Sequence, residues 1–138
     1  MSDLLAAHRA LYEAVESGDV DLMASLWVSA PDTTCTHPGT TPLRGTPAIL
    51  RSWTALMATS GYVQFFLTDV QSTLLDPVTA VVTCTENILS GQGLDDAESF
   101  AGGRVASTSV LLRRRGRWQF HSRHASPLID FDADLEED

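Results

Sequence analysis

The sequence predicts an α+β domain in which three helices come first and antiparallel strands follow. Apolar residues recur at helical spacing in three segments before Gly61, and beyond it they alternate with polar residues. Two later segments, 104–113 and 117–125, also alternate and are joined by a short turn at Gly116. This order predicts helices packed on one face of a sheet, and 138 residues suffice for a single core.

Two helices open the chain as a helical hairpin. Ser2 can cap the first helix, and Gly18 lies where that helix would stop. Asp19 can cap a shorter second helix, which Pro31 ends. The apolar faces carry Leu4, Leu5, Leu11, Tyr12 and Val15 in the first helix and Leu22, Met23, Leu26 and Trp27 in the second.

A short strand and a third helix come next. Residues 33–37 are rich in β-branched side chains and stop at Pro38, which predicts an edge strand that leads into an irregular loop. Thr46 followed by Pro47 is a typical N-cap and first turn of a helix. The apolar positions that follow predict a helix ending near Gly61.

The remaining strands should form two hairpins. Residues 63–75 and 78–89 alternate on either side of a turn, and the second run is rich in β-branched side chains. Segments 104–113 and 117–125 should pair in the same way. Residues 90–103 contain four glycines and three acids, so we expect a loop that is mobile or covers a pocket.

Much of the formal net charge of −9 comes from the C-terminus. Residues 130–138 hold six of the 18 acidic residues, and without them twelve acids face nine arginines. A nucleic-acid partner is not expected, because such binding depends on neutralising phosphates. We divide the chain into one domain, 1–129, and an acidic, flexible tail, 130–138.

The residue content also excludes several kinds of chemistry. The chain has no lysine, so neither a lysine Schiff base nor a phosphate-loop lysine can occur. Cys35 and Cys84 lie in apolar, strand-like stretches and are expected to fill the core. No ligand spacing predicts a metal site, and we expect no cofactor. Without a secretory signal or a long apolar segment, the protein is expected to be soluble and cytoplasmic.

One histidine is a candidate for a reactive group. His37 precedes Pro38 and Gly39 beside a turn, in an otherwise apolar protein. If it faces a cavity, its imidazole, with an ordinary pKa of about 6.5, can accept a proton at physiological pH. The alternative is a structural histidine that hydrogen-bonds the adjacent loop.

Several short features follow one another in a characteristic order: Gly18 with Asp19, Trp27, the loop from His37 to Gly39, Gly45, Trp53 and the segment 118–127. In this order, from about Leu4 to Pro127, the chain resembles the SnoaL-like group of the nuclear transport factor two and ketosteroid isomerase superfamily. The resemblance implies a cone-shaped, curved antiparallel sheet wrapped around the three N-terminal helices, a cavity at one end, and a homodimer formed through the sheet face. Members include isomerases, cyclases, dehydratases, hydrolases and non-catalytic association modules, so the fold alone does not select a reaction.

The resemblance also implies roles for particular residues. In the isomerase relatives an aspartate directly before a proline in the first strand is the base, and His37 occupies the similar position before Pro38. This implies that His37 is the catalytic residue. The relatives hold the oxyanion with a tyrosine and a protonated acid; Tyr12 lies near the tyrosine position but out of alignment, and no acid matches.

We expect six further side chains to line the pocket: Tyr12, Trp27, Trp53, Glu86, Trp118 and His124. By alternation His124 shares a face with Trp118, which places it on the cavity floor, in the core or in a dimer interface. Glu86 lies on an apolar face, where it is either a pocket acid with a raised pKa or an outward carboxylate paired with Arg104 or Arg113.

Together these features predict a protein that binds a small apolar or aromatic metabolite in an internal pocket. Proton transfer through His37, of an isomerase, cyclase or hydrolase type, is the candidate activity. The alternative is a non-catalytic small-molecule-binding or dimeric association domain, which needs the pocket but neither an acid nor a base.

Overall fold

The computed structural model describes residues 2–90 and 103–129 of the chain. Its helices are α1 (Ser2–Ser17), α2 (Val20–Ser25) and α3 (Thr46–Thr59). Its strands are β1 (Thr34–Thr36), β2 (Leu43–Arg44), β3 (Val63–Asp76), β4 (Thr79–Ser90), β5 (Arg104–Arg114) and β6 (Arg117–Pro127). Most of the predicted loop at 90–103 and all of the predicted acidic tail at 130–138 lie outside the described residues.

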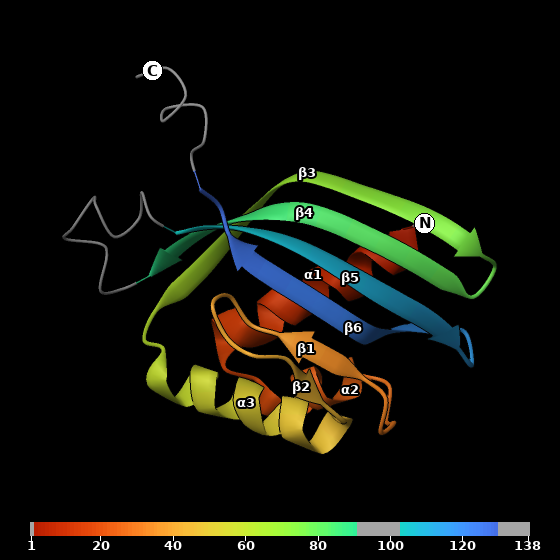
Figure 1. The fold of residues 1–138 in the computed structure, drawn as a ribbon, viewed down its shortest axis with the longest axis horizontal. Helices are drawn as coiled ribbons and strands as arrows, with labels where there is room; N and C mark the ends of the chain where they lie inside the picture. The colour runs from red at the N-terminus through yellow and green to blue at the C-terminus, as the bar shows by residue number, and fades with distance from the viewer. Residues whose placement is uncertain (1, 91–102, 130–138) are drawn as a thin grey trace.

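The strands form one open sheet in the order β2-β1-β6-β5-β4-β3. Both predicted hairpins are confirmed, because β3 pairs antiparallel with β4 and β5 pairs antiparallel with β6. Figure 1 shows these four long strands side by side, curving over α1. The strand predicted at 33–37 is present as β1, but its predicted position at the edge of the sheet is wrong. After the loop the chain returns as β2 on the outer side of β1, and β1 runs parallel to β6.

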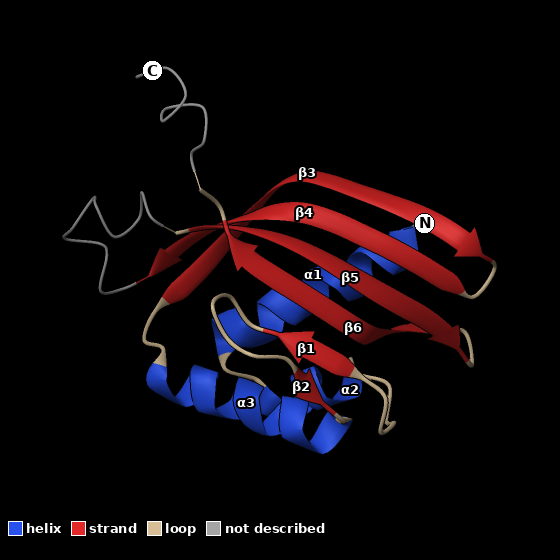
Figure 2. Ribbon diagram, in the orientation of Figure 1, coloured by secondary structure: helices blue, strands red, loops and turns tan. Residues whose placement is uncertain are grey.

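All three helices lie on the same side of the sheet (Figure 2). Their buried side chains form one core with the inward side chains of the strands, including Leu11, Ile49, Trp53, Val82 and Phe120. Such a core between helices and one sheet face confirms the predicted α+β class. No helix among residues 2–90 and 103–129 has the length and hydrophobicity that a lipid bilayer demands of a spanning segment.

The break between α1 and α2 follows the chemistry that the sequence predicts. Gly18 adopts a φ of 67°, a left-handed conformation that glycine reaches without steric cost. The Asp19 carboxylate accepts a hydrogen bond from the Leu22 amide at 3.0 Å and caps α2. Since α2 ends at Ser25, Trp27 lies beyond the helix, at the sheet edge of the core.

A bulge in β6 decides which of its side chains face inward. The register with β5 shifts by one residue between Phe120 and Ser122, so His121 is an extra residue in β6. Side chains in a strand alternate, and one extra residue reverses the alternation beyond it. As a result Arg123 is buried in the interior, whereas His124 is exposed on the outer face of the sheet.

Candidate functional site

A cavity of about 370 Å³ lies among α1, α3 and the inner face of the sheet, and we call it the inner cavity. Its walls are mainly apolar: Leu11, Val15, Pro38, Trp53, Leu56, Val63, Phe65 and Ile88. Few polar residues reach it, namely Tyr12, His37, Thr40, Ser60 and Arg123. A cavity of this size and composition suits a small organic ligand that is held by a few polar contacts.

His37 forms part of the cavity wall and is 9% exposed. Its Nε2 lies 2.9 Å from the hydroxyl oxygen of Ser52, which stands on α3. That hydroxyl already donates to the carbonyl oxygen of Ile49 at 2.6 Å, so it accepts from His37. This arrangement assigns the proton to Nε2 and leaves the lone pair on Nδ1, which has no hydrogen-bond donor among the described residues.

The imidazole of His37 is neutral near pH 7. Burial lowers its pKa, and the positive charge of Arg123 lowers that pKa further. The ring of Trp53 packs against it edge to face, with ring centroids 4.7 Å apart. A neutral imidazole fixed in this way can accept a proton from a bound molecule or from water.

A buried ion pair stands beside the same cavity. The Nη1 group of Arg123 donates to Oε2 of Glu86 at 2.7 Å, and Nη2 donates to Oε1 at 3.3 Å. The Tyr12 hydroxyl donates to Glu86 Oε2 at 2.6 Å and accepts from Arg123 Nη1 at 3.2 Å. The three residues belong to α1, β4 and β6, so this network ties the first helix to two strands of the sheet.

The network keeps both charged groups ionised. Burial would raise the pKa of Glu86, but the Arg123 charge and hydrogen bonds from Arg123 and Tyr12 lower it below its ordinary value. Burial would lower the pKa of Arg123, but the Glu86 carboxylate raises it. Burial raises the pKa of Tyr12, so its phenol stays protonated. The network is therefore neutral overall while it presents a guanidinium to the cavity.

The structure brings some of the predicted pocket residues together. Three of them line the inner cavity: Tyr12, His37 and Trp53. Glu86 is 1% exposed, and it is hydrogen-bonded to two cavity residues without itself lining the space. The alternative of an outward Glu86 paired with Arg104 or Arg113 is wrong, because its partner is the buried Arg123.

Two predicted residues of β6 do not reach the inner cavity. His124 is exposed on the outer face, so its placement on the cavity floor is wrong. The physical reason is the bulge at His121, which reverses the alternation on which that placement relied. Trp118, before the bulge, is partly buried and packs against the core instead of lining the cavity.

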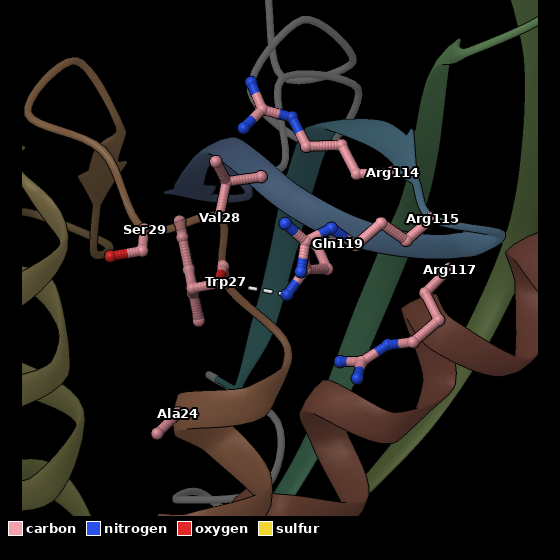
Figure 3. A pocket seen from close by; sticks show the side chains of 8 residues that line it. All are labelled: Ala24, Trp27, Val28, Ser29, Arg114, Arg115, Arg117 and Gln119. Carbon is pink, nitrogen blue, oxygen red and sulfur yellow. Dashed lines mark hydrogen bonds between the residues drawn. The ribbon is translucent and has the colours of Figure 1, made fainter.

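Trp27 lines a different pocket, of about 460 Å³, at the turn between β5 and β6. Its other lining residues are Ala24, Val28, Ser29, Arg114, Arg115, Arg117 and Gln119. Figure 3 shows them around Trp27, whose carbonyl oxygen accepts from the Gln119 amide at 3.3 Å. Arg117 and Gln119 also donate to the Ser25 carbonyl oxygen at the end of α2. Among the described residues, no histidine, carboxylate or cysteine lines this pocket, whereas His37 lines the inner cavity, so the inner cavity is the candidate site.

Sequence reasoning missed Arg123 and Ser52. Counting by two from Phe120 assigns Arg123 to the outer face, and only the bulge brings it inside. One signal was available, because a carboxylate such as Glu86 on an apolar face needs a buried basic partner. Nothing in the sequence distinguishes Ser52 from the other polar residues of α3.

The buried Cys35 thiol is poorly suited to nucleophilic chemistry. Burial raises the pKa of Cys35 to about 11, so its thiol is protonated and a poor nucleophile. Residues 2–90 and 103–129 contain no group of three or more histidine, cysteine, aspartate or glutamate side chains that could hold a metal ion.

The stability of the fold should decrease in acid because of His8. This residue is 1% exposed, and burial, followed by the Arg123 charge, lowers its pKa to about 4 from 6.5. The unfolded chain therefore binds more protons between these two values. We expect the free energy of unfolding to fall as the pH drops through that window, by up to about 3 kcal/mol from this group.

A His8→Leu variant should remove this part of the pH dependence, because leucine cannot bind a proton. Urea denaturation of both proteins across the window measures the effect. An identical loss of stability in the variant and the parent would contradict the assignment to His8.

The chain is similar to known proteins in both sequence and structure. The family model described as a SnoaL-like domain matches residues 4–130. A structure from Streptomyces avermitilis, provisionally described as a dehydratase of the NTF2-like family, is 38% identical with a TM-score of 0.79, and the match covers 93% of this chain and 95% of that one.

Two further structures share the fold at lower identity. One, from Thiobacillus denitrificans and provisionally described as a calcium/calmodulin-dependent protein kinase type II association domain, is 23% identical with a TM-score of 0.77, over 91% of this chain and 94% of that one. The other, from Novosphingobium aromaticivorans and provisionally described as an aromatic ring hydroxylase, is 17% identical with a TM-score of 0.71, over 92% and 87%. Among curated proteins none matches the sequence significantly.

Proposed function

The chain belongs to the SnoaL-like family, and on that basis we propose that it binds a small apolar or aromatic metabolite in the inner cavity and acts on it by proton transfer through His37. The observation that carries the proposal is a neutral imidazole with its Nδ1 lone pair unused, in the wall of a mainly apolar cavity. Burial of a ligand there would exclude water and place its reacting atoms beside the base.

Of the possible reactions, dehydration has support from a relative. The Streptomyces avermitilis protein, 38% identical, carries the provisional description of a dehydratase. In such a reaction His37 would take a proton from a carbon of the ligand, and the electron pair of that C–H bond would form a double bond as a hydroxyl leaves from the neighbouring carbon. The protonated imidazole would return the proton to the leaving hydroxyl, which departs as water.

Incubation with a metabolite extract, followed by native mass spectrometry, tests this proposal. We expect the protein to capture a small apolar or aromatic compound and to release it with a changed mass or a changed isomeric form. A compound that binds and is always released unchanged would instead support the alternative, a binding domain without catalytic function.

We also propose that the protein is a homodimer through the outer face of the sheet. Away from the strand ends, the outward side chains of β4, β5 and β6 are uncharged and mostly small or β-branched: Val81, Thr83, Thr85, Ala106, Thr108, Val110, Ser122 and His124. A surface of small and β-branched side chains without carboxylates or arginines can pack against a second copy of itself with two-fold symmetry.

A Val110→Glu variant should dissociate this dimer. Val110 lies on the central strand β5 of that face, opposite Val81 and Ser122, so the new carboxylate would be buried without a partner in an interface formed by this face. The matched control is Val70→Glu, because Val70 is 40% exposed on the edge strand β3. Light scattering should report a dimer for the parent and the control and a monomer for Val110→Glu. A monomeric parent would contradict the proposal.

A further inference from the structure

The pocket beside Trp27 gathers three arginines around one space. Arg114, Arg115 and Arg117 all line it, and their side chains extend from the turn between β5 and β6 toward the segment that carries Trp27 (Figure 3). None of the three forms an ion pair with a carboxylate in the part of the chain that the structure describes. In a chain with a formal net charge of −9, the pocket is thus a local concentration of positive charge.

The arginines repel one another within the hairpin. Arg114 and Arg117 are directly opposite in the register of β5 and β6, and Arg115 lies in the two-residue turn between them. Like charges directly opposite each other on paired strands destabilise the pair. A negatively charged group bound between the guanidinium groups would relieve this repulsion.

The turn also holds an arginine in a conformation that suits other residues better. Arg115 and Gly116 have φ values of 53° and 77°, and the favoured two-residue hairpin turn needs such positive values at both positions. Glycine, asparagine and aspartate adopt this conformation at little cost, whereas it is uncommon for longer side chains. Residues held in such conformations cluster at functional sites. The backbone and the charge of Arg115 both cost stability, which indicates a use for its side chain outside the turn.

The wall that faces the arginines is held in place by β6. The Val28 amide donates to the carbonyl oxygen of Phe120 at 2.9 Å, and the Trp27 ring packs against the Phe120 ring with centroids 5.6 Å apart. Nη2 of Arg117 donates to the Ser25 carbonyl oxygen at 2.9 Å. This bond fixes the guanidinium, while its Nη1 and Nε have no acceptor among the described residues.

Three guanidinium groups around one space match a phosphate group better than a carboxylate. One arginine can bind both oxygens of a carboxylate, so a carboxylate needs only one. A phosphate monoester carries close to two negative charges near pH 7 and has three terminal oxygens, which can accept from several arginines at once. The pocket, at about 460 Å³, also has room for an organic part, and Trp27, Val28 and Ala24 give it an apolar side. The negative charge of the rest of the chain disfavours a long polyanion such as nucleic acid.

We propose that this pocket binds a small organic phosphate monoester, with its phosphate group held by Arg114, Arg115 and Arg117 and its organic part against Trp27. The proposal does not depend on the proposed function, because the pocket and the inner cavity have no lining residue in common among the described residues.

Three small anions separate the possible ligand classes. They are phenyl phosphate, an aromatic monoester; benzoate, the same ring with a carboxylate; and inorganic phosphate. In calorimetric titrations at about pH 7.5 and about 0.15 M sodium chloride, phenyl phosphate should bind about tenfold tighter than benzoate. It should bind about threefold tighter than inorganic phosphate, because its ring covers apolar surface. Equal or tighter binding of benzoate, or of inorganic phosphate, would overturn the proposal of a monoester, as would no binding of phenyl phosphate.

Substitution of the turn residue locates the site. Arg115→Asn removes the guanidinium and supplies a residue that suits the turn, so it should weaken phenyl phosphate binding about tenfold. Without ligand, the same variant should melt about 2–4 °C above the parent, because strain and repulsion are both reduced. Arg114→Gln should weaken binding to a similar extent. The matched control is Arg113→Gln, because Arg113 does not line the pocket and lies opposite Trp118. That control should change the affinity less than about twofold.

The two measurements on Arg115→Asn distinguish a ligand of the phosphate from a structural residue. A gain in melting temperature together with a loss of affinity is the result that the proposal predicts. A loss of both would make Arg115 a structural residue and overturn its assignment. Equal weakening by Arg113→Gln would show a general attraction to positive charge without a defined site, which also overturns the proposal.

Discussion

Replacement of Arg123 by methionine should lower the free energy of unfolding by about 3–5 kcal/mol near pH 7. The reason is the carboxylate of Glu86, which is 1% exposed and would lose the only oppositely charged partner that the structure gives it among the described residues. Methionine approximates the length of the arginine stem, so packing losses are kept small. Urea denaturation of the parent and the variant measures the difference.

The pH dependence of this effect identifies its cause. With Arg123 present, the pKa of Glu86 is lowered, so its contribution to stability is present at neutral pH and is lost as the pH falls through that lowered value. Without Arg123, burial dominates and the pKa of Glu86 rises. The difference in free energy of unfolding between the parent and the variant should therefore be smallest in acid, where Glu86 is protonated. If that difference in free energy of unfolding stays constant from neutral to acidic pH, the unpaired charge of Glu86 is not its cause.

A second variant separates the lost charge from the lost packing. In Glu86→Gln with Arg123→Met, no charge remains in the network, and the Tyr12 hydroxyl can still donate to the amide oxygen of the new glutamine. We expect this double variant to recover most of the stability that Arg123→Met loses. A double variant as unstable as the sum of both single variants would show that the two side chains contribute independently.

Replacement of His37 by glutamine should reduce the turnover of a captured metabolite by about 10²–10⁴-fold. Glutamine keeps a side-chain amide that can donate to Ser52, so the wall of the cavity should remain in place and ligand affinity should change little. The loss should therefore appear in the rate at saturating ligand. His121→Gln is a suitable control, because His121 lies at the β6 bulge, outside the inner cavity.

The pH profile of the parent supplies a second readout for His37. Burial and the Arg123 charge lower the pKa of this imidazole, so the base should stay unprotonated at pH values where an exposed histidine is already charged. The acid limb of the rate profile should consequently lie below about pH 6.5. Full activity in His37→Gln, or an acid limb above that value, would contradict the assignment of His37 as the base.

The fold was predictable from local patterns, because each element carries its own signal. The spacing of apolar residues predicts the helices, the Gly18 and Asp19 pair predicts the break between the first two, and alternation predicts both hairpins. The position of β1 was not predictable in this way. Its pairing with β6 is long-range, which short segments of sequence do not encode, and its other partner β2 has only two residues.

The site was predictable only where it depends on local features. His37 is marked by the strand end and the following Pro38, and Tyr12 and Trp53 by the inward faces of their helices. Arg123 and His124 exchanged their expected faces because one extra residue entered β6, and no glycine or proline marks that position. Because of this one extra residue, the side chain that faces inward is Arg123 instead of the predicted His124, and the cavity gains a positively charged group.

The central claim is that His37 moves a proton to and from a metabolite bound in the inner cavity. The most direct measurement is deuterium incorporation into a captured metabolite, in heavy water, compared between the parent and His37→Gln by mass spectrometry. We predict that the parent places deuterium on a carbon of the captured compound, or eliminates water from it, and that His37→Gln binds the same compound without either change. The same change at the same rate in both proteins, or neither deuterium incorporation nor loss of water with the parent, would contradict the claim.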